Sequence, residues 1–116
     1  MNRTRMLAAA AVAALGIAAP SGAATPKLVA NVSDPLHISL KQGGKTVKTL
    51  KAGAYTIVVQ DQASDHNFHL SGPGLNKKTS IGDKGTFTWK VKLVKGTYSY
   101  VCDPHASVMK GSFTVS

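Results

Sequence analysis

Three side chains in the segment YVCDPHASVMKG, residues 100–111, are able to bind a soft metal ion. Cys102 is the only cysteine of the chain, His105 follows three residues later, and Met109 is the only methionine after residue 6. Thiolate, imidazole and thioether ligands together suit copper, and one cysteine with two histidines and a long axial methionine is an arrangement that transfers single electrons. The segment supplies all of these ligands except the second histidine.

The second histidine is expected at the end of a neighbouring strand, and three candidates remain: His37, His66 and His69. In HNFHLSG (66–72), Phe68 and Leu70 share one face by the two-residue period of a strand. His66 falls on that apolar face and His69 on the other, which makes His66 the better ligand and leaves His69 as the alternative. Asn67 is then placed to hydrogen-bond across to the ligand loop and fix it.

The elements that must position these residues are predicted to be strands. Short runs rich in β-branched and aromatic residues are separated by Gly, Pro, Asn and Asp, and no helical period of useful length occurs. The predicted strands cover residues 27–33, 36–50 as a hairpin about Gly43-Gly44, 55–61, 66–72, 85–94, 96–102 and 111–116. GPG at 72–74 is read as a stop. Seven or eight short strands predict an all-β Greek-key sandwich or barrel, with Tyr98 as its tyrosine-corner residue.

Two motifs resemble the cupredoxins, and within them the small plastocyanin-, pseudoazurin- and amicyanin-like type 1 (blue) copper proteins. They are HN at 66–67 and GTYSYVCDPHASVMKGSFTV at 96–115, set in a small all-β chain. Cys102, Pro104 and His105 match the Cys-x2-His spacing of the family and its usual proline. Three residues separate His105 from Met109, an intermediate loop length for the family.

The resemblance implies an eight-stranded Greek-key sandwich that holds one type 1 copper ion per chain. It implies His66, Cys102, His105 and Met109 as the ligands. It also implies outer-sphere transfer of single electrons by Cu(II)/Cu(I) cycling, and hence a carrier rather than an enzyme.

The charge balance bears on the partner. The whole chain carries +9, and without Arg3 and Arg5 the net charge is +7. This favours a redox partner with an acidic docking surface. Apolar neighbours of His105 at 104, 106 and 108 are expected to form the contact patch, with residues 72–75 as a second piece of its rim. Nucleic acid is disfavoured, because the lysines are scattered and residues 25–116 contain no arginine.

The first 24 residues have the three parts of a secretory signal: a basic start, an apolar run at 6–19 and small residues at 20–24. The apolar run is too short to span a bilayer comfortably, although a retained anchor is the alternative. We expect cleavage after Ala23 or Ala24. The remaining domain, residues 25–116, is expected to work in the periplasm or as a secreted protein, as a monomer without stable membrane insertion.

Four other functions fit the same residues less well. A copper carrier or storage protein would deliver the ion itself, but such proteins tend to expose Met- or His-rich tracts, and none is present here. A cupredoxin-fold binding module without metal is disfavoured by the full ligand set. A thiol enzyme built on Cys102 and His105 is disfavoured because residues three apart in a tight loop rarely pair as nucleophile and base. A structural zinc site usually uses CxxC pairs, which are absent.

Overall fold

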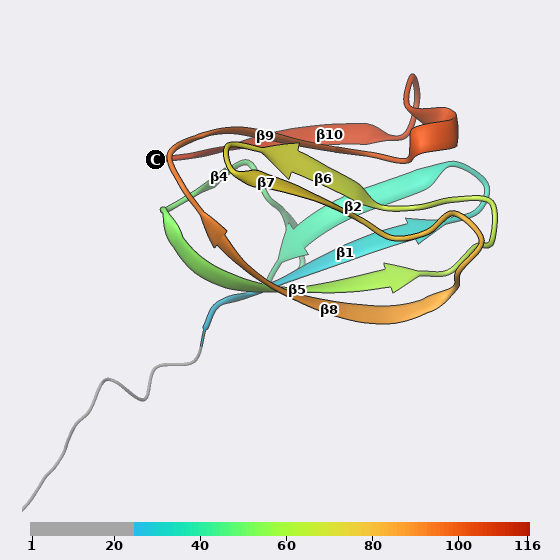
Figure 1. Cartoon of the computed structure of the whole chain (residues 1–116), viewed down its shortest axis with the longest axis horizontal. Coiled ribbons are helices and arrows are strands. Elements are labelled where there is room, and N and C mark those ends of the chain that lie inside the picture. The colour runs from blue at the N-terminus through green and yellow to red at the C-terminus, as the bar shows by residue number, and fades with distance from the viewer. Residues whose placement is uncertain (1–24) are drawn as a thin grey trace, which may run out of the picture.

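The computed structural model describes residues 25–116, which form two five-stranded β-sheets packed face to face (Figure 1). The predicted secretory signal, residues 1–24, lies outside the described residues. The first sheet has the order β3-β2-β1-β5-β8. Its strands are β1 (Lys27–Ser33), β2 (His37–Gln42), β3 (Lys45–Thr46), β5 (Gly53–Asp61) and β8 (Gly85–Leu93).

The second sheet has the order β4-β10-β9-β6-β7. Its strands are β4 (Thr49–Leu50), β6 (His69–Gly72), β7 (Leu75–Lys78), β9 (Gly96–Val101) and β10 (Lys110–Val115). A 3₁₀ turn, Asp103–His105, follows β9. The all-β sandwich is confirmed, and the part of the chain that the structure describes contains no helix long and apolar enough to cross a membrane.

The core lies between the sheets and follows the predicted alternation. In β5, Tyr55, Ile57 and Val59 are buried, while the residues between them are more exposed. Phe68 and Leu70 are fully buried on the facing side. Because burial of one large apolar side chain contributes about 1.5–3 kcal/mol, this shared layer is the main stabilising contact between the sheets.

Two glycine-containing turns lie where the sequence predicts them, at 43–44 and at 73–74. Gly43 and Gly44 form the predicted two-residue turn between β2 and β3, with φ angles of 57° and 82°. Such positive φ values at both central positions are those of a type I′ hairpin turn. The stop predicted at GPG is confirmed, because β6 ends at Gly72. The strand that follows was not predicted: the chain turns at 73–74 and returns as β7, which pairs with β6. β7 has the sequence LNKK, whose three polar residues carry no strand pattern.

Tyr98 is the predicted tyrosine corner. It is fully buried, its hydroxyl accepts a hydrogen bond from the N–H of Val94 at 3.0 Å, and it donates to the carbonyl of Pro73 at 3.0 Å. The ring lies so close to Gly72 that a Cβ there would overlap it. Tyr98 thus joins two turns at one end of the sandwich.

The two ends of the sandwich differ. β1, β5, β7 and β9 finish at the end that we call the loop end, which holds segments 34–36, 62–68, 79–84 and 102–109. The opposite end, the turn end, holds the short turns at 51–52, 73–74 and 94–95. Figure 1 shows the 3₁₀ turn Asp103–His105 at the loop end and the C-terminus at the turn end.

Candidate metal centre

Three possible ligand atoms converge at the loop end. The Sγ of Cys102 lies 3.6 Å from Nδ1 of His66 and 3.5 Å from Nδ1 of His105. The two Nδ1 atoms are 3.2 Å apart. The centre of such a triangle lies about 2 Å from each atom, which is close to the metal–nitrogen bonds of about 2.0–2.1 Å found at sites of this kind. The three atoms therefore frame a trigonal metal position.

His66 belongs to segment 62–68, between β5 and β6, and is fully buried. Its Nε2 donates a hydrogen bond to the carbonyl of Pro35 at 3.0 Å, and the carboxylate of Asp34 lies 3.1 Å from the same nitrogen. Because a carbonyl can only accept, the proton of the neutral ring is held on Nε2. The lone pair of Nδ1 is then directed at the triangle, as in ligands oriented by an outer hydrogen bond.

Cys102 follows directly after β9, and its thiol is free and fully buried. The backbone N–H of Asn67 points at its Sγ from 3.5 Å. An N–H aimed at sulfur stabilises negative charge there, and the thiolate is the form that binds a metal. This contact ties the segment of His66 and Asn67, just before β6, to Cys102 at the end of the neighbouring strand β9.

The ligand loop 102–109 is closed by backbone hydrogen bonds. The N–H of His105 donates to the carbonyl of Cys102 at 2.9 Å, and the N–H of Met109 donates to the carbonyl of His105 at 2.8 Å. The N–H of Cys102 donates to the carbonyl of Met109 at 3.0 Å. Met109 is fully buried and belongs to the apolar core. Its backbone is fixed beside the other candidate ligands, and its role as an axial ligand stays a prediction.

Asn67 makes the contacts to the ligand loop that the sequence predicted. Its Nδ2 donates to Oδ2 of Asp103 at 2.8 Å and to the carbonyl of Thr79 at 3.2 Å. The backbone N–H of Asp103 donates back to Oδ1 of Asn67 at 2.8 Å. Four polar groups are satisfied in this arrangement, which fixes the segment of His66 to the loop of Cys102.

His69 lies outside the triangle, as expected for the opposite strand face. Its Nδ1 donates to Oδ1 of Asp103 at 2.8 Å, and its Nε2 lies 2.6 Å from Oδ1 of Asn76. The hydrogen bond to Asp103 raises the pKa of His69 above 6.5. Partial burial favours the neutral acid of Asp103, but hydrogen bonds from His69 and Asn67 outweigh it, so the pKa of Asp103 is lowered.

The sequence reasoning missed the support that aspartates give to this end. Asp103, which stands between two candidate ligands, was not singled out. Asp61 is also buried, and burial raises its pKa above 3.8. Its carboxylate accepts hydrogen bonds from the Thr79 hydroxyl and the Ala63 N–H, each at 3.3 Å. A charged residue closing the apolar run YTIVVQD was the one available signal for this contact.

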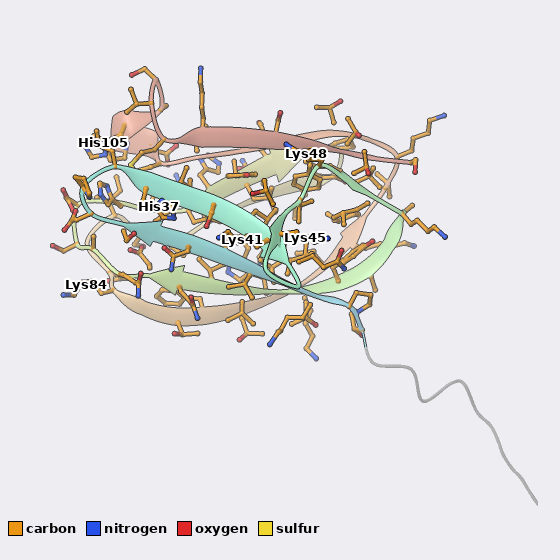
Figure 2. All side chains as sticks on the ribbon, turned by 180° about the vertical axis from the view of Figure 1, so that it is seen from behind. His37, Lys41, Lys45, Lys48, Lys84 and His105 are labelled. Carbon is orange, nitrogen blue, oxygen red and sulfur yellow. The ribbon has the colours of Figure 1, made fainter. Side chains whose placement is uncertain are left out.

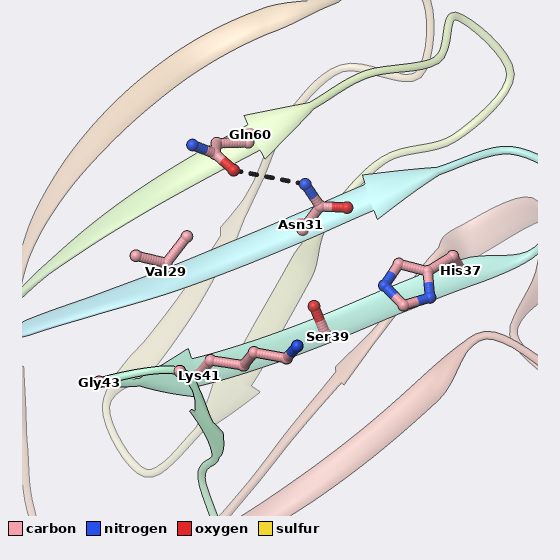
Figure 3. Close-up of a pocket in the computed structure, with 8 residues that line it drawn as sticks. Val29, Asn31, His37, Ser39, Lys41, Gly43 and Gln60 are labelled. Carbon is pink, nitrogen blue, oxygen red and sulfur yellow. Dashed lines mark hydrogen bonds between the residues drawn. The ribbon is translucent and has the colours of Figure 1, made fainter.

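His37 takes no part in the triangle. It is exposed at the start of β2 and lines a shallow depression on the outer face of the first sheet (Figure 3). The depression also contains Asn31, whose Nδ2 donates to Oε1 of Gln60 at 3.4 Å. A second group at the loop end, formed by Asp34, Asp65 and His66, uses the same Nε2 that bonds to Pro35. Asp34, at 3.1 Å, is close enough to share the Nε2 proton with Pro35, whereas Asp65 lies 3.9 Å away.

The surface around the triangle is partly apolar. His105 is partly exposed at the loop end (Figure 2), beside the exposed Pro104 and Ala106. Val108 is 62% exposed, and Leu36 at the same end is 50% exposed. The second rim piece predicted at 72–75 is wrong, because that turn contacts Tyr98 and lies at the opposite end.

The chain is similar in sequence and in fold to known copper proteins. A family model described as copper binding proteins, plastocyanin/azurin family, matches residues 33–116. Reduced rusticyanin superposes with a TM-score of 0.56 at 20% identity, with 78% of each chain covered. A mutant of amicyanin in its reduced state gives a TM-score of 0.51 at 19% identity, with 83% of this chain and 88% of that chain covered. No curated protein sequence matches the chain. The resemblance read from the sequence is confirmed at the level of family and fold.

Proposed function

Because the chain belongs to the plastocyanin/azurin family of copper-binding proteins, we propose that it is a type 1 copper protein that carries single electrons. His66, Cys102 and His105 form the trigonal ligand set for one copper ion per chain, with Met109 as the axial ligand. The observation that carries the proposal is the triangle of Nδ1, Sγ and Nδ1 atoms with sides of 3.2–3.6 Å. Bound copper would supply the one-electron couple.

The protein supplies a ligand frame that resists movement. Asn67 and Asp103 join the two ligand-bearing segments, and Pro35 holds the ring of His66. Full burial of His66 and Cys102 keeps water away from the triangle. A frame fixed by backbone and outer hydrogen bonds would keep the same geometry whether the bound copper is Cu(II) or Cu(I). This rigidity favours rapid electron transfer and opposes catalysis on a bound substrate.

His105 is the proposed exit for the electron. It is the only partly exposed member of the triangle, and apolar side chains of Pro104, Ala106 and Val108 flank it on the surface. A redox partner protein would dock on this patch, because burying its apolar atoms against the partner is favourable. Docking there would bring the redox cofactor of the partner close to His105. An acidic docking surface would meet Lys84 and Lys110 at the same end.

The place of action is part of the proposal. Residues 1–24 have the sequence of a secretory signal cleaved after Ala23 or Ala24. The domain of residues 25–116 would then work as a monomer in the periplasm or as a secreted protein. A lone thiol in such an oxidising compartment is protected when it is buried and bound to a metal, as proposed for Cys102.

The experiment that tests electron carriage cycles the copper-loaded protein with a soluble reductant and a soluble oxidant. Copper content is measured after desalting at each step, together with the visible spectrum. We expect one copper per chain through repeated cycles, with the blue colour lost and regained. Release of copper on reduction would contradict the proposal and favour delivery of the ion. Cys102→Ser is the control that should show no colour at any step.

A further inference from the structure

The charges of the protein are separated along its long axis. All five aspartates lie at the loop end, in or beside its four segments: Asp34, Asp61, Asp65, Asp83 and Asp103. The chain contains no glutamate, so no acidic side chain lies at the turn end. Four lysines share the loop end with the aspartates: Lys77, Lys78, Lys84 and Lys110.

Lysines dominate the turn end. Lys51 and Lys95 lie in its turns, and Lys92 pairs with Ala54 next to one of them. Lys27 begins β1 at this end, and the carbonyl of Lys48 accepts a hydrogen bond from Thr114 near the end of β10. Lys90 is level with Lys27, because both residues pair with Thr56. Lys45 directly follows the Gly43-Gly44 turn, which also belongs to the turn end, and Lys41 pairs with Val29, two residues farther along β1. Figure 2 shows Lys84 and His105 at the same end of the molecule, with Lys41, Lys45 and Lys48 farther along it.

These lysines are available to a partner. All of them are exposed, and none forms an ion pair with a side chain among residues 25–116. The turn end is therefore a basic surface, while acidic and basic side chains nearly balance at the loop end.

The basic surface cannot be the electron-transfer contact. His105 lies at the loop end, and a partner that docks on it does not reach Lys51 or Lys95 at the turn end. The lysines of the turn end are thus free for another contact, while Lys84 and Lys110 remain at the end where the redox partner would dock. Two such contacts at opposite ends are compatible, because neither covers the other.

We propose that the turn end binds a membrane surface of anionic phospholipid, which leaves the copper end facing away from the bilayer. The lysines lie on the first sheet and on the connections to the second sheet, and residues 25–116 contain no arginine to recognise a phosphate or carboxylate by a bidentate bond. Such a broad set of point charges suits a fluid layer of anionic headgroups more than one shaped protein site. Val94, 40% exposed in the turn beside Lys95, gives this surface an apolar tip.

The path of the chain supports the same partner. Thr25 and Pro26 precede β1 at the turn end, where the carbonyl of Pro26 accepts a hydrogen bond from Thr56 at 2.9 Å. Residues before 25 are therefore joined to this end, and a secretory signal would hold the lysines next to the membrane during export. The inference rests on the proposed function only for which end carries copper, since lipid binding itself needs no metal.

The test measures binding of residues 25–116, which contain both complete sheets, to vesicles. Vesicles of phosphatidylcholine alone are compared with vesicles that contain roughly one-third phosphatidylglycerol, which provides the anionic surface. We expect binding only to the anionic vesicles, equally for copper-loaded and metal-free protein. Binding should disappear near 1 M salt, where the screening length falls to about 3 Å.

Two matched triple variants locate the surface. K51Q/K92Q/K95Q removes three lysines of the turn end and K78Q/K84Q/K110Q removes three of the loop end, so both lose the same net charge. At roughly fivefold per lysine, the first should weaken binding by about a hundredfold, while the second should change it far less. Equal losses in both would overturn the proposal, because they would reflect net charge alone. Unchanged visible spectra of both variants would show that either result is independent of the copper site.

Two further measurements decide the orientation and the partner. Vesicle-bound protein should be reduced by a soluble reductant as fast as free protein, because the loop end faces solvent. Slower reduction would show that the loop end is covered and would overturn the proposal. Soluble polyglutamate serves as the acidic-protein probe. Tighter binding to it than to vesicles, lost in K51Q/K92Q/K95Q, would assign the surface to an acidic protein and also overturn the proposal.

Discussion

Asn67 and Asp103 exchange two hydrogen bonds across the metal end. The side-chain amide of Asn67 donates to the Asp103 carboxylate at 2.8 Å, and the Asp103 backbone N–H donates to the Asn67 carbonyl oxygen at 2.8 Å. The N–H of Asn67 also points at the sulfur of Cys102. One asparagine therefore fixes the position of the segment of His66 relative to the loop that carries the thiol and His105.

Replacement of Asn67 should weaken both the fold and the site. Asn67→Ala leaves the Asp103 N–H, one oxygen of its partly exposed carboxylate and the buried Thr79 carbonyl without these partners. The free energy of unfolding should therefore fall by about 1.5–3 kcal/mol. The copper of the variant should be lost faster to a chelator. Asn31→Ala is the control, because Asn31 bonds to Gln60 within the first sheet and touches neither ligand segment. It should cost less than about 0.5 kcal/mol. Equal effects of the two changes, measured by urea unfolding, would contradict the role of Asn67.

The His69–Asp103 pair should make stability depend on pH. The raised pKa of His69 means that its contribution is complete below its ordinary value of 6.5 and is lost as pH rises through the higher folded value. The lowered pKa of Asp103 means that its contribution is present above 3.8 and is lost as pH falls through the lower folded value. The pair should therefore stabilise the fold most between pH 3.8 and 6.5.

The measurement compares metal-free wild type and His69→Gln across that range. The difference in unfolding free energy should stay below about 1 kcal/mol, as for other part-exposed pairs, and should shrink at both extremes. Burial raises the pKa of Asp61, so this residue makes stability fall with rising pH, in the opposite sense to Asp103. Because Asp61 is present in both wild type and His69→Gln, its effect cancels in the difference between them. A difference that grows above pH 6.5 would show that the pair is not what stabilises this corner.

Met109 should act on the copper more than on the core. Met109→Leu keeps the buried volume nearly constant, so it should cost less than about 1.5 kcal/mol of stability. If Met109 is the axial ligand, the reduction potential must change, because this ligand tunes it. Voltammetry of the blue protein makes the comparison. A potential equal to that of wild type would show that Met109 serves only as packing.

Variants of His66 and His69 distinguish which of these two residues is the first histidine ligand. His66→Ala removes one corner of the triangle and should abolish the blue absorption. His69→Ala should leave one copper per chain and a closely similar spectrum, because the Asp103 contact lies outside the triangle. The visible spectrum and the copper content check both variants. Loss of the site through His69→Ala alone would reverse the assignment.

Local patterns were sufficient where one face of a strand is buried. The alternation of Phe68 and Leu70 placed His66 on the buried side, although the strand itself begins only at His69 and His66 lies in the segment before it. The reason is that residues 66–68, which precede the hydrogen-bonded strand, are as buried as the inward-facing residues of the strand itself. The Gly43-Gly44 turn and the Tyr98 corner were found because each depends on residues close in sequence.

Features that depend on the paired sheets were not visible in the sequence. β7 is held by its register with β6, and its residues LNKK show no apolar face. The role of Asp103 requires Asn67 and His69 from a different strand connection. The pairing of the strands decides which connections share an end, and so it separates the aspartates from many of the lysines. Net charge alone therefore predicted an acidic partner but not the surface to which a partner binds.

The central claim is that Cys102 binds copper as a thiolate together with His66 and His105. The most direct test adds Cu(II) in steps to residues 25–116 with the thiol reduced and records the visible spectrum. A strong blue band that saturates at one copper per chain is the predicted result. Tight binding without that band would mean a site of another construction, and no binding by a folded sample would mean that the triangle is only packing.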